Sequence, residues 1–260
     1  MNNGNNNNSS LPFAIIGLVL LAAVAGGFWF YQNSKSQASK PKTNTNANKK
    51  QDDAAALQLY ATAPPGAQPA NVLGSPTATV TVEEFADFQC PTCGVQHPKM
   101  KEINSLYGNR IKFIFRNFPL NQVHPKAYDA AVAAEAAGLQ GKYWAMQDQL
   151  FGNQLAWVNA PDSRKVFDEY AQKIGLNVVK FQTDMLGIAA KSRVDADTAR
   201  GRALGINGTP TIYINGKRIA FEQSDVEPMR QIIDAELQKA SSPTQSNQPT
   251  NTADNSAENK

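Results

Sequence analysis

The sequence predicts an α/β fold in which a mixed sheet is covered by helices and a helical subdomain is inserted between two parts of the sheet. Three observations lead to this prediction. The strand patterns Thr77–Phe85 and Lys112–Phe118 flank a helical pattern, and the three together form a β-α-β unit. A helical stretch over about residues 124–204 follows this unit. A β-hairpin with Asn215-Gly216 at its turn then precedes the last helix of the folded body.

Composition divides the chain into five segments. Residues 1–10 are mostly asparagine, and residues 11–31 form an apolar run without a charge. Residues 32–70 are rich in Ser, Asn, Lys, Gln, Ala and Pro, which is typical of a flexible linker. Residues 71–240 are the predicted folded body and have the size of one domain. Residues 241–260 are polar without periodicity, and we expect this tail to be disordered.

The first strand, Thr77–Phe85, alternates small or apolar residues with polar ones, so Ala78, Val80 and Val82 are expected on its inward face. A helical pattern with Pro98 inside it begins just after this strand. Its predicted buried face consists of Val95, Met100, Ile103 and Leu106.

The predicted insertion contains three helical patterns. Ala127–Phe151 is rich in alanine and has an expected break near residues 138–141. Asp162 is the expected N-cap of a second helix, which Gly175 ends. The apolar stripe of that helix consists of Val166, Phe167, Tyr170, Ala171 and Ile174. The third pattern runs from about residue 177 to residue 204.

The end of the body is predicted to be a hairpin followed by a helix. Thr211–Ile214 and Lys217–Ala220 are the two hairpin strands. Ser224 and Glu227 have the spacing of a capping box at the start of the last helix. The apolar face of this helix consists of Met229, Ile232, Ile233 and Leu237.

Cys90 and Cys93 are the only cysteines of the chain, and they form one C-x-x-C motif. Cys90 is predicted to be a helix N-cap, with Pro91 at the first helical position. Unpaired backbone N–H groups and the positive end of the helix dipole stabilise a thiolate at that place. We therefore expect the pKa of Cys90 to fall below the value of about 8.5 for a free cysteine. Cys93 lies one turn further in, so Cys90 is the predicted attacking thiol and Cys93 the resolving thiol.

The cysteine pair has two alternative interpretations. The pair could be half of a zinc site that His97 and His124 complete, since zinc takes four N or S ligands. However, the spacing fits no common zinc pattern. The pair could also be an inert structural disulfide, but a bridge that closes so short a loop stabilises a protein little. We expect neither a metal nor a cofactor.

The residues Gly208-Thr209-Pro210-Thr211 lead into the hairpin. Together with Phe88-x-Cys90-Pro91-Thr92-Cys93 and the inserted helices, they resemble the thioredoxin superfamily and are most similar to DsbA-like, membrane-tethered thiol–disulfide oxidoreductases. The resemblance covers about residues 71–240 and implies a thioredoxin-like fold with an inserted helical subdomain. It also implies that Pro210 is cis and packs against the active-site disulfide, and that the Thr209 backbone pairs with an extended client peptide.

The resemblance further implies that Glu84 lies beneath the active site and moves protons for the buried cysteine. The period of two in a strand places Glu84 on the same face as Val80 and Val82, although a bulge would turn it to solvent. The sequence departs from many oxidases of the family at Thr92, where they carry a histidine. The motif therefore does not determine how strongly oxidising the Cys90–Cys93 pair is. His97 lies outside the motif and is expected to face solvent.

The apolar run 11–31 is predicted to be an uncleaved signal anchor, because at a rise of about 1.5 Å per residue it spans a bilayer. A cleavable signal peptide is the alternative, since Ala23-Val24-Ala25 resembles a cleavage site. Lysines follow the run and none precedes it, so the positive-inside rule favours a cytoplasmic body. We nevertheless expect the body outside the cytoplasm, because a disulfide-handling pair suits an oxidising compartment.

These observations predict a single-pass membrane protein whose extracytoplasmic domain forms disulfides in exported proteins. Client proteins with thiols or disulfides, and a membrane redox partner that recycles Cys90 and Cys93, are the expected partners. The near balance of charge gives no argument for nucleic acid. A disulfide reductase of the same fold is one alternative function, because the direction of electron transfer depends on the reduction potential. A non-catalytic module that binds peptides at Thr209 and Pro210 is a second alternative. An isomerase is disfavoured, because no separate dimerisation domain is evident.

Overall fold

The computed structural model describes residues 45–242, so the predicted anchor 11–31 and nearly all of the predicted tail lie outside the described residues. A boundary between two units of the chain falls after Lys50. The first described helix, α2, has the bounds Thr45–Thr62, and all other described elements belong to the second unit. Among the described residues, no helix combines the length and the apolar character that a membrane crossing needs.

Within residues 45–242, five strands form one mixed sheet in the order β1-β3-β2-β4-β5. The central strands β2 and β3 are parallel, and each of the other neighbouring pairs is antiparallel. The strands are β1 (Asn71–Gly74), β2 (Val80–Ala86), β3 (Ile111–Asn117), β4 (Thr211–Ile214) and β5 (Lys217–Arg218). The predicted mixed sheet is thus confirmed, while the short edge strand β1 was not predicted.

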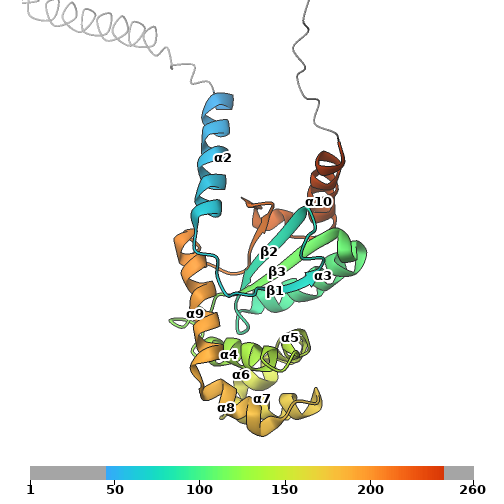
Figure 1. The fold of residues 1–260 in the computed structure, drawn as a ribbon. Helices are drawn as coiled ribbons and strands as arrows, with labels where there is room; N and C mark the ends of the chain where they lie inside the picture. Colours follow the sequence, from blue (N-terminus) through green and yellow to red (C-terminus); the bar gives the residue numbers. More distant parts are fainter. Residues whose placement is uncertain (1–44, 243–260) are drawn as a thin grey trace, which may run out of the picture. The chain divides into compact units, whose positions relative to one another are not determined.

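Helices cover the sheet and form the insertion between β3 and β4. The crossover from β2 to β3 is α3 (Pro91–Tyr107), which ends in the short 3₁₀ helix η1 (Gly108–Arg110). Another 3₁₀ helix, η2 (Phe221–Gln223), precedes the last helix, α10 (Val226–Ser241). Figure 1 shows the helices α4 to α8 as one group, from which α9 leads back to the sheet. The inserted helices are α4 (Ala127–Gly138), α5 (Tyr143–Gly152), α6 (Gln154–Asn159), α7 (Ser163–Lys173), α8 (Val178–Leu186) and α9 (Ile188–Ala203).

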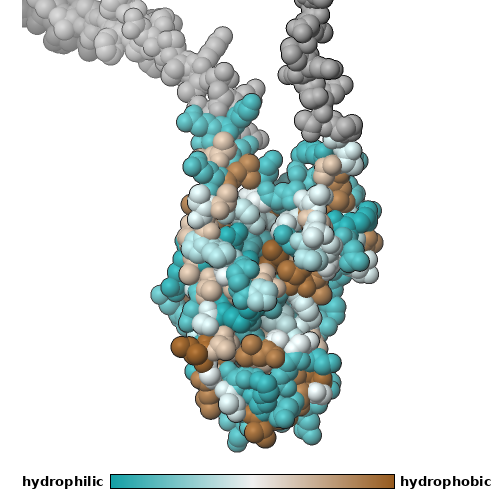
Figure 2. Space-filling view, viewed as in Figure 1, coloured by the Kyte–Doolittle hydropathy of each residue, from teal (hydrophilic) through white to brown (hydrophobic). Residues whose placement is uncertain are grey.

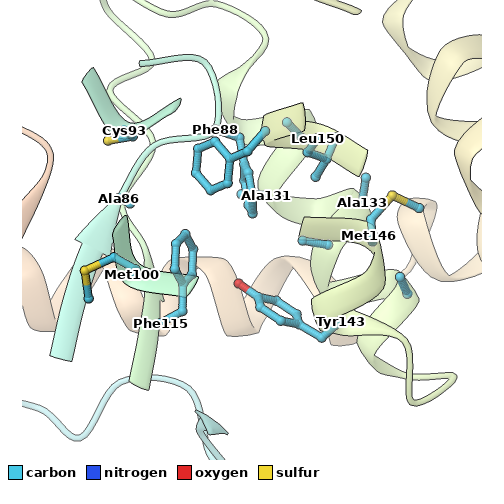
Figure 3. Close-up of a cluster of buried hydrophobic side chains, with 14 of the residues drawn as sticks. Ala86, Phe88, Cys93, Met100, Phe115, Ala131, Ala133, Tyr143, Met146 and Leu150 are labelled. Carbon is cyan, nitrogen blue, oxygen red and sulfur yellow. The ribbon is translucent and has the colours of Figure 1, made fainter. Parts of the chain in front are cut away.

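One continuous hydrophobic cluster joins the sheet to the insertion. Val80 and Val82 of β2 belong to it together with Met100 of α3. The same cluster reaches Leu150 of α5 and Phe181 of α8, and each of these side chains is almost completely buried. Figure 3 shows aromatic rings, among them Phe88 and Phe115, between the sheet and the α5 helix. The insertion is therefore packed onto the sheet through a shared core.

The opposite face of β2 carries buried charges. Glu83 lies between two arginines: Arg116 of β3 donates to its Oε1 atom at 2.7 Å, and Arg200 of α9 donates to its Oε2 atom at 3.0 Å. Arg116 also donates to Asp197 of α9 at 2.9 Å. All four side chains are at most 8% exposed. Removing one partner of such a pair leaves a buried charge without compensation, so these contacts fix α9 against the sheet.

The same arginines hold the segment before β1, which corrects the predicted extent of the linker. Arg116 donates to the carbonyls of Pro65 and Ala67 at 2.9 and 3.1 Å, and Arg200 donates to that of Pro64 at 2.9 Å. The linker was expected to continue to residue 70. The backbone from Pro64 to Ala67 instead belongs to the folded body, because its carbonyl groups satisfy donors of the buried arginines.

Two local predictions were wrong. Val95 and Leu106 are 62% and 45% exposed, and the buried face of α3 includes Gln96 instead, because its amide donates to the Ser224 carbonyl at 2.8 Å. The predicted capping box at Ser224 is absent from this part of the structure: Asp225 is the N-cap of α10, and the Ser224 hydroxyl donates to the Phe221 carbonyl at 2.7 Å.

Most other element predictions are confirmed with small shifts. The break in the alanine-rich pattern separates α4 from α5, and Asp162 caps α7 by accepting from the Arg164 N–H at 3.1 Å. Asn215 and Gly216 form the hairpin turn, both with positive φ. The first strand begins at Val80, so Ala78 lies before it and is only half-buried.

The close packing of α9 on the sheet predicts the effect of a single added methyl group. A Cβ atom at Gly201 would lie 2.5 Å from the Phe118 ring and 3.2 Å from the Phe85 ring. Gly201→Ala should therefore lower the free energy of unfolding by about 1–3 kcal/mol, measured by urea denaturation. Gly152→Ala is the control, since its added Cβ meets nothing within 4 Å. Equal denaturation midpoints for the two variants would show that α9 can move away from the sheet at little cost.

Candidate active site

The loop between β2 and α3 is shaped by the buried carboxylate of Asp87. One oxygen of this side chain accepts from the Gln89 N–H at 2.7 Å. The other oxygen accepts from the Leu120 N–H at 2.8 Å and contacts His124 Nδ1 at 2.8 Å. The Asp87 carbonyl accepts from the Cys90 N–H at 3.1 Å. These bonds turn the chain at the end of β2, so that the C-x-x-C motif begins the next helix.

Cys90 has the predicted place at the N-cap of α3, with Pro91 following it in the first turn. Cys90 forms no disulfide and is 7% exposed, and its sulfur lies 3.4 Å from the Thr209 carbonyl oxygen. The hydrogen bond from Cys93 is the largest cause that lowers the pKa of Cys90 to about 5. Burial opposes this shift, whereas the neighbouring residue Thr209 and the N–H groups of Cys93 and Thr92 add to it. The helix N-terminus thus contributes as expected, but the neighbouring sulfur contributes more.

Cys93 lies beneath Cys90 and is 1% exposed. Its sulfur accepts from the Asp87 N–H at 3.5 Å. Burial, followed by the hydrogen bond to Cys90 and that neighbour's charge, raises the pKa of Cys93 well above its usual value. At neutral pH the outer sulfur is therefore a thiolate and the inner one a thiol. This division agrees with the order of the two cysteines that the sequence predicts.

Glu84 is buried on β2, so the alternative in which it faces solvent is wrong. Its side chain is 3% exposed, and burial raises its pKa to about 8. In the sheet it lies between Phe115 of β3 and Ile212 of β4. When Glu84 is ionised, its charge raises the pKa of Cys93 further. An acid with this pKa can gain and release a proton at neutral pH.

The Thr209–Pro210 peptide bond is cis, which confirms that prediction. Antiparallel pairing of Phe85 in β2 with Thr211 in β4 carries this bond to the end of the sheet where Cys90 lies. The Thr209 hydroxyl is buried and lacks a hydrogen-bond partner within residues 45–242. A hollow of ≈ 140 Å³ lies along the same loop and is lined by Pro210, Ile219 and Phe221, among others.

The two histidines do not join the cysteines. His97 Nε2 contacts Asp148 Oδ1 at 2.9 Å, and its ring stacks on Phe151. Its side chain is only 12% exposed, so the expectation that it faces solvent was wrong. His124 contacts Asp87. No group of three or more His, Cys, Asp or Glu side chains in the described part of the chain is arranged to hold a metal ion, which removes the support for a zinc site.

The sequence did not single out Asp87, although it supports the loop and the inner sulfur. The available signal was an acidic residue directly after a buried strand and three residues before Cys90. A carboxylate at that place can accept from the backbone N–H groups that a sharp turn leaves unpaired.

Comparisons with known proteins agree with this architecture. A family model described as thioredoxin matches residues 67–235. The crystal structure of oxidised BdbD from Bacillus subtilis is 26% identical, with a TM-score of 0.55, and the similarity covers 68% of this chain and 98% of that one. The thiol-disulfide exchange protein α-DsbA2 from Wolbachia pipientis shares the fold at 17% identity, with a TM-score of 0.60, over 71% of this chain and 97% of that one.

One relative is named as an antiporter rather than as a thiol–disulfide protein. The Na(+)/H(+) antiporter NhaA 1 of Mycolicibacterium gilvum is 36% identical over 152 residues, which are 57% of this chain but only 24% of the antiporter. The chain thus spans about a quarter of the length of that relative, and the likeness carries no antiporter activity to it. The family match over residues 67–235 decides the assignment, and the solved structures share the fold: this chain belongs to the thioredoxin family.

Proposed function

We propose that the protein catalyses dithiol–disulfide exchange through Cys90 and Cys93 and that it forms disulfides in exported proteins. The observation that carries this proposal is the opposite shift of the two thiol pKa values. The pKa of Cys90 falls to about 5, while burial raises that of Cys93 well above its usual value. The Cys90 sulfur is thereby suited to leave a mixed disulfide as a thiolate. The buried Cys93 sulfur is suited to stay protected from client thiols.

The exchange begins with the oxidised Cys90–Cys93 disulfide. A client thiolate attacks the Cys90 sulfur, the bond between the two enzyme sulfurs breaks, and Cys93 leaves with the electron pair and takes up a proton. A second client thiolate then attacks the client sulfur of the mixed disulfide. This step forms the client disulfide and releases Cys90 as a thiolate. The client loses two electrons and the enzyme gains them, so a membrane redox partner must remove two electrons to restore the disulfide.

The direction of transfer follows from the stability of the reduced enzyme. A Cys90 thiolate that accepts hydrogen bonds lowers the free energy of the dithiol form relative to the disulfide. The stabilised thiolate therefore favours oxidation of clients over their reduction. The missing histidine at Thr92 is compensated in part by the hydrogen bond from Cys93.

Glu84 is the proposed proton donor and acceptor for Cys93. Its pKa of about 8 keeps it mostly protonated at neutral pH, and its ionised form would raise the pKa of the inner sulfur. The protonated carboxyl group can supply the proton that Cys93 takes up when it leaves, and it can accept that proton during reoxidation. The backbone of Thr209, beside the Cys90 sulfur, is the proposed place where an extended client segment pairs.

We further propose that the apolar run 11–31 anchors the protein in the membrane and that the described body lies outside the cytoplasm. A tether would keep the body close to the redox partner and to newly exported chains. The proposed compartment suits the chemistry, since disulfides persist where the surroundings are oxidising.

Substitution of each cysteine separates the roles of the two sulfurs. Cys90→Ser should abolish client oxidation, together with the thiolate absorbance of the reduced protein near neutral pH. Cys93→Ser should keep an attacking thiolate without a resolving partner, so covalent enzyme–client adducts should accumulate and disappear with reductant. Non-reducing electrophoresis and ultraviolet absorbance measure both effects. Adducts on Cys93 in the Cys90→Ser variant would reverse the assigned order, and unchanged client oxidation in both variants would leave only a peptide-binding module.

The buried acid predicts a pH dependence of stability. Glu84 has a pKa of about 8 in the folded protein against a usual value of 4.5, so the folded state binds a proton that the unfolded chain releases. Its contribution to the free energy of unfolding should therefore fall as pH rises from 4.5 to about 8. In the oxidised protein, where neither sulfur titrates, Glu84→Gln should be the more stable form at pH 8 by on the order of 3 kcal/mol.

Urea denaturation at pH 5 and pH 8 measures this difference. Glu102→Gln, at an exposed position of α3, is the control and should leave the pH dependence unchanged. A Glu84→Gln variant with the same pH dependence as the unmodified protein would mean that Glu84 is ionised in the folded state at neutral pH.

The proposed location is tested by a fusion after Ala240. A reporter enzyme that is active only after export should be active there, and a reporter that is active only in the cytoplasm should be inactive in the same position. The opposite result would place the body inside, in agreement with the lysines that follow the apolar run.

A further inference from the structure

The insertion contacts the C-x-x-C loop through a side chain that has no assigned role. Gln154 is the first residue of α6. Its Nε2 atom donates to the Phe88 carbonyl at 2.7 Å and to the Cys90 carbonyl at 2.9 Å. One amide of the insertion therefore bridges two carbonyl groups of the loop that presents the attacking cysteine.

The Cys90 carbonyl has donors on two sides. It accepts from the Gly94 N–H at 3.1 Å, as the N-cap carbonyl of α3, and from Gln154 as well. Gln154 also packs closely on Gly94: a Cβ atom on that glycine would lie 3.0 Å from Gln154 Oε1. The peptide plane after Cys90 is thus held by the helix on one side and by the glutamine on the other.

A second contact of the insertion supports the same loop. The Phe88 ring packs on Phe151 of α5, with ring centroids 4.7 Å apart, and Phe88 is buried. Phe151 and Gln154 are three residues apart, so a short segment of the insertion supplies both an apolar and a polar contact to Phe88. The bridge made by Gln154 is therefore accompanied by a buried aromatic contact from the same short segment.

We propose that Gln154 is a positioning residue for the exchange reaction, because its bonds to the carbonyls of Phe88 and Cys90 hold the Cys90 sulfur against the first turn of α3. The N–H groups of Thr92 and Cys93 in that turn are among those that stabilise the thiolate. The amide also compensates the partial negative charge of two carbonyl oxygens close to the sulfur. The inference rests on the proposed exchange function, and it assigns to the insertion a direct effect on the reactivity of Cys90.

Gln154→Met tests this inference, since methionine has a similar length and no hydrogen-bond donor. The reduced full-length variant should show a Cys90 thiol pKa that is higher by about one unit, so that alkylation by iodoacetamide near pH 5 slows by about fivefold. Gln154→Glu should raise the pKa more, because a carboxylate would face two carbonyl oxygens and add a negative charge beside the thiolate.

Gln140→Met is the matched control. Gln140 also makes two side chain–backbone bonds inside the insertion, donating to the Asn177 carbonyl at 3.2 Å and accepting from the Asn177 N–H at 3.0 Å. Its loss should affect thermal stability about as much as that of Gln154 but should leave the Cys90 pKa unchanged. A Cys90 pKa that is the same in Gln154→Met, Gln140→Met and the unmodified protein would overturn the proposal and make Gln154 a structural residue.

The thiol titration requires no client and no recycling partner. Failure of the proposed function would appear as absent client oxidation in the unmodified protein, even if Gln154→Met shifts the Cys90 pKa. Failure of the positioning role would appear as an unshifted pKa, even if the unmodified protein oxidises clients. The two failures are therefore distinguishable.

Discussion

The interaction between the sulfurs of Cys90 and Cys93 determines how the rest of the site works. It lowers the pKa of the outer thiol and raises that of the inner one, and no other contact contributes more to the shift at Cys90. The interaction needs Cys93 to hold its proton, which burial favours. It also needs Cys90 to lie at the N-cap of α3, where the N–H groups of Thr92 and Cys93 help to lower its pKa. The reactivity of one sulfur thus depends on the burial of the other.

The fold supplies this arrangement from both faces of β2. On one face, Glu84 and the main hydrophobic cluster lie beneath α3, so the inner sulfur is shielded from water. On the other face, Glu83 joins Arg116 and Arg200 and fixes α9 to the sheet. The helix α9 leads into the loop with the cis Thr209–Pro210 bond, so this buried network also helps to position Thr209 beside Cys90.

Figure 2 shows that the outer surface of the described residues in this view is mixed, with polar residues between smaller apolar patches.

Local signals in the sequence were sufficient for the elements that carry the chemistry. Residues adjacent in the sequence determine three of these elements: a strand, a C-x-x-C motif with proline in the first helical turn, and an Asn-Gly hairpin. The structure has all three at the expected positions, with Cys90 as the N-cap. The four-residue strand β1 was missed because Asn71 and Gly74 at its ends have low strand propensity, and it forms by pairing with β3.

Contacts between distant residues could not be predicted in this way. Glu83 and Arg200 are 117 residues apart, and nothing near either residue indicates the pair. Gln154 and Cys90 are 64 residues apart, so the bridge between them follows only from the packing of the insertion. The error on the α3 face has the same origin: Gln96 is buried because the Ser224 carbonyl accepts its amide, a partner 128 residues away. Tertiary hydrogen bonds here outweigh the apolar periodicity that predicted Val95 and Leu106 as core.

The central claim is that a stabilised Cys90 thiolate makes the reduced form favourable and the disulfide an oxidant. The reduction potential of the Cys90–Cys93 couple, measured at equilibrium with glutathione buffers at pH 7, tests this claim most directly. We expect a potential on the oxidising side of about −180 mV, toward the value of about −120 mV that is characteristic of DsbA. A potential near about −270 mV, as in thioredoxin, would contradict it and make the protein a reductase.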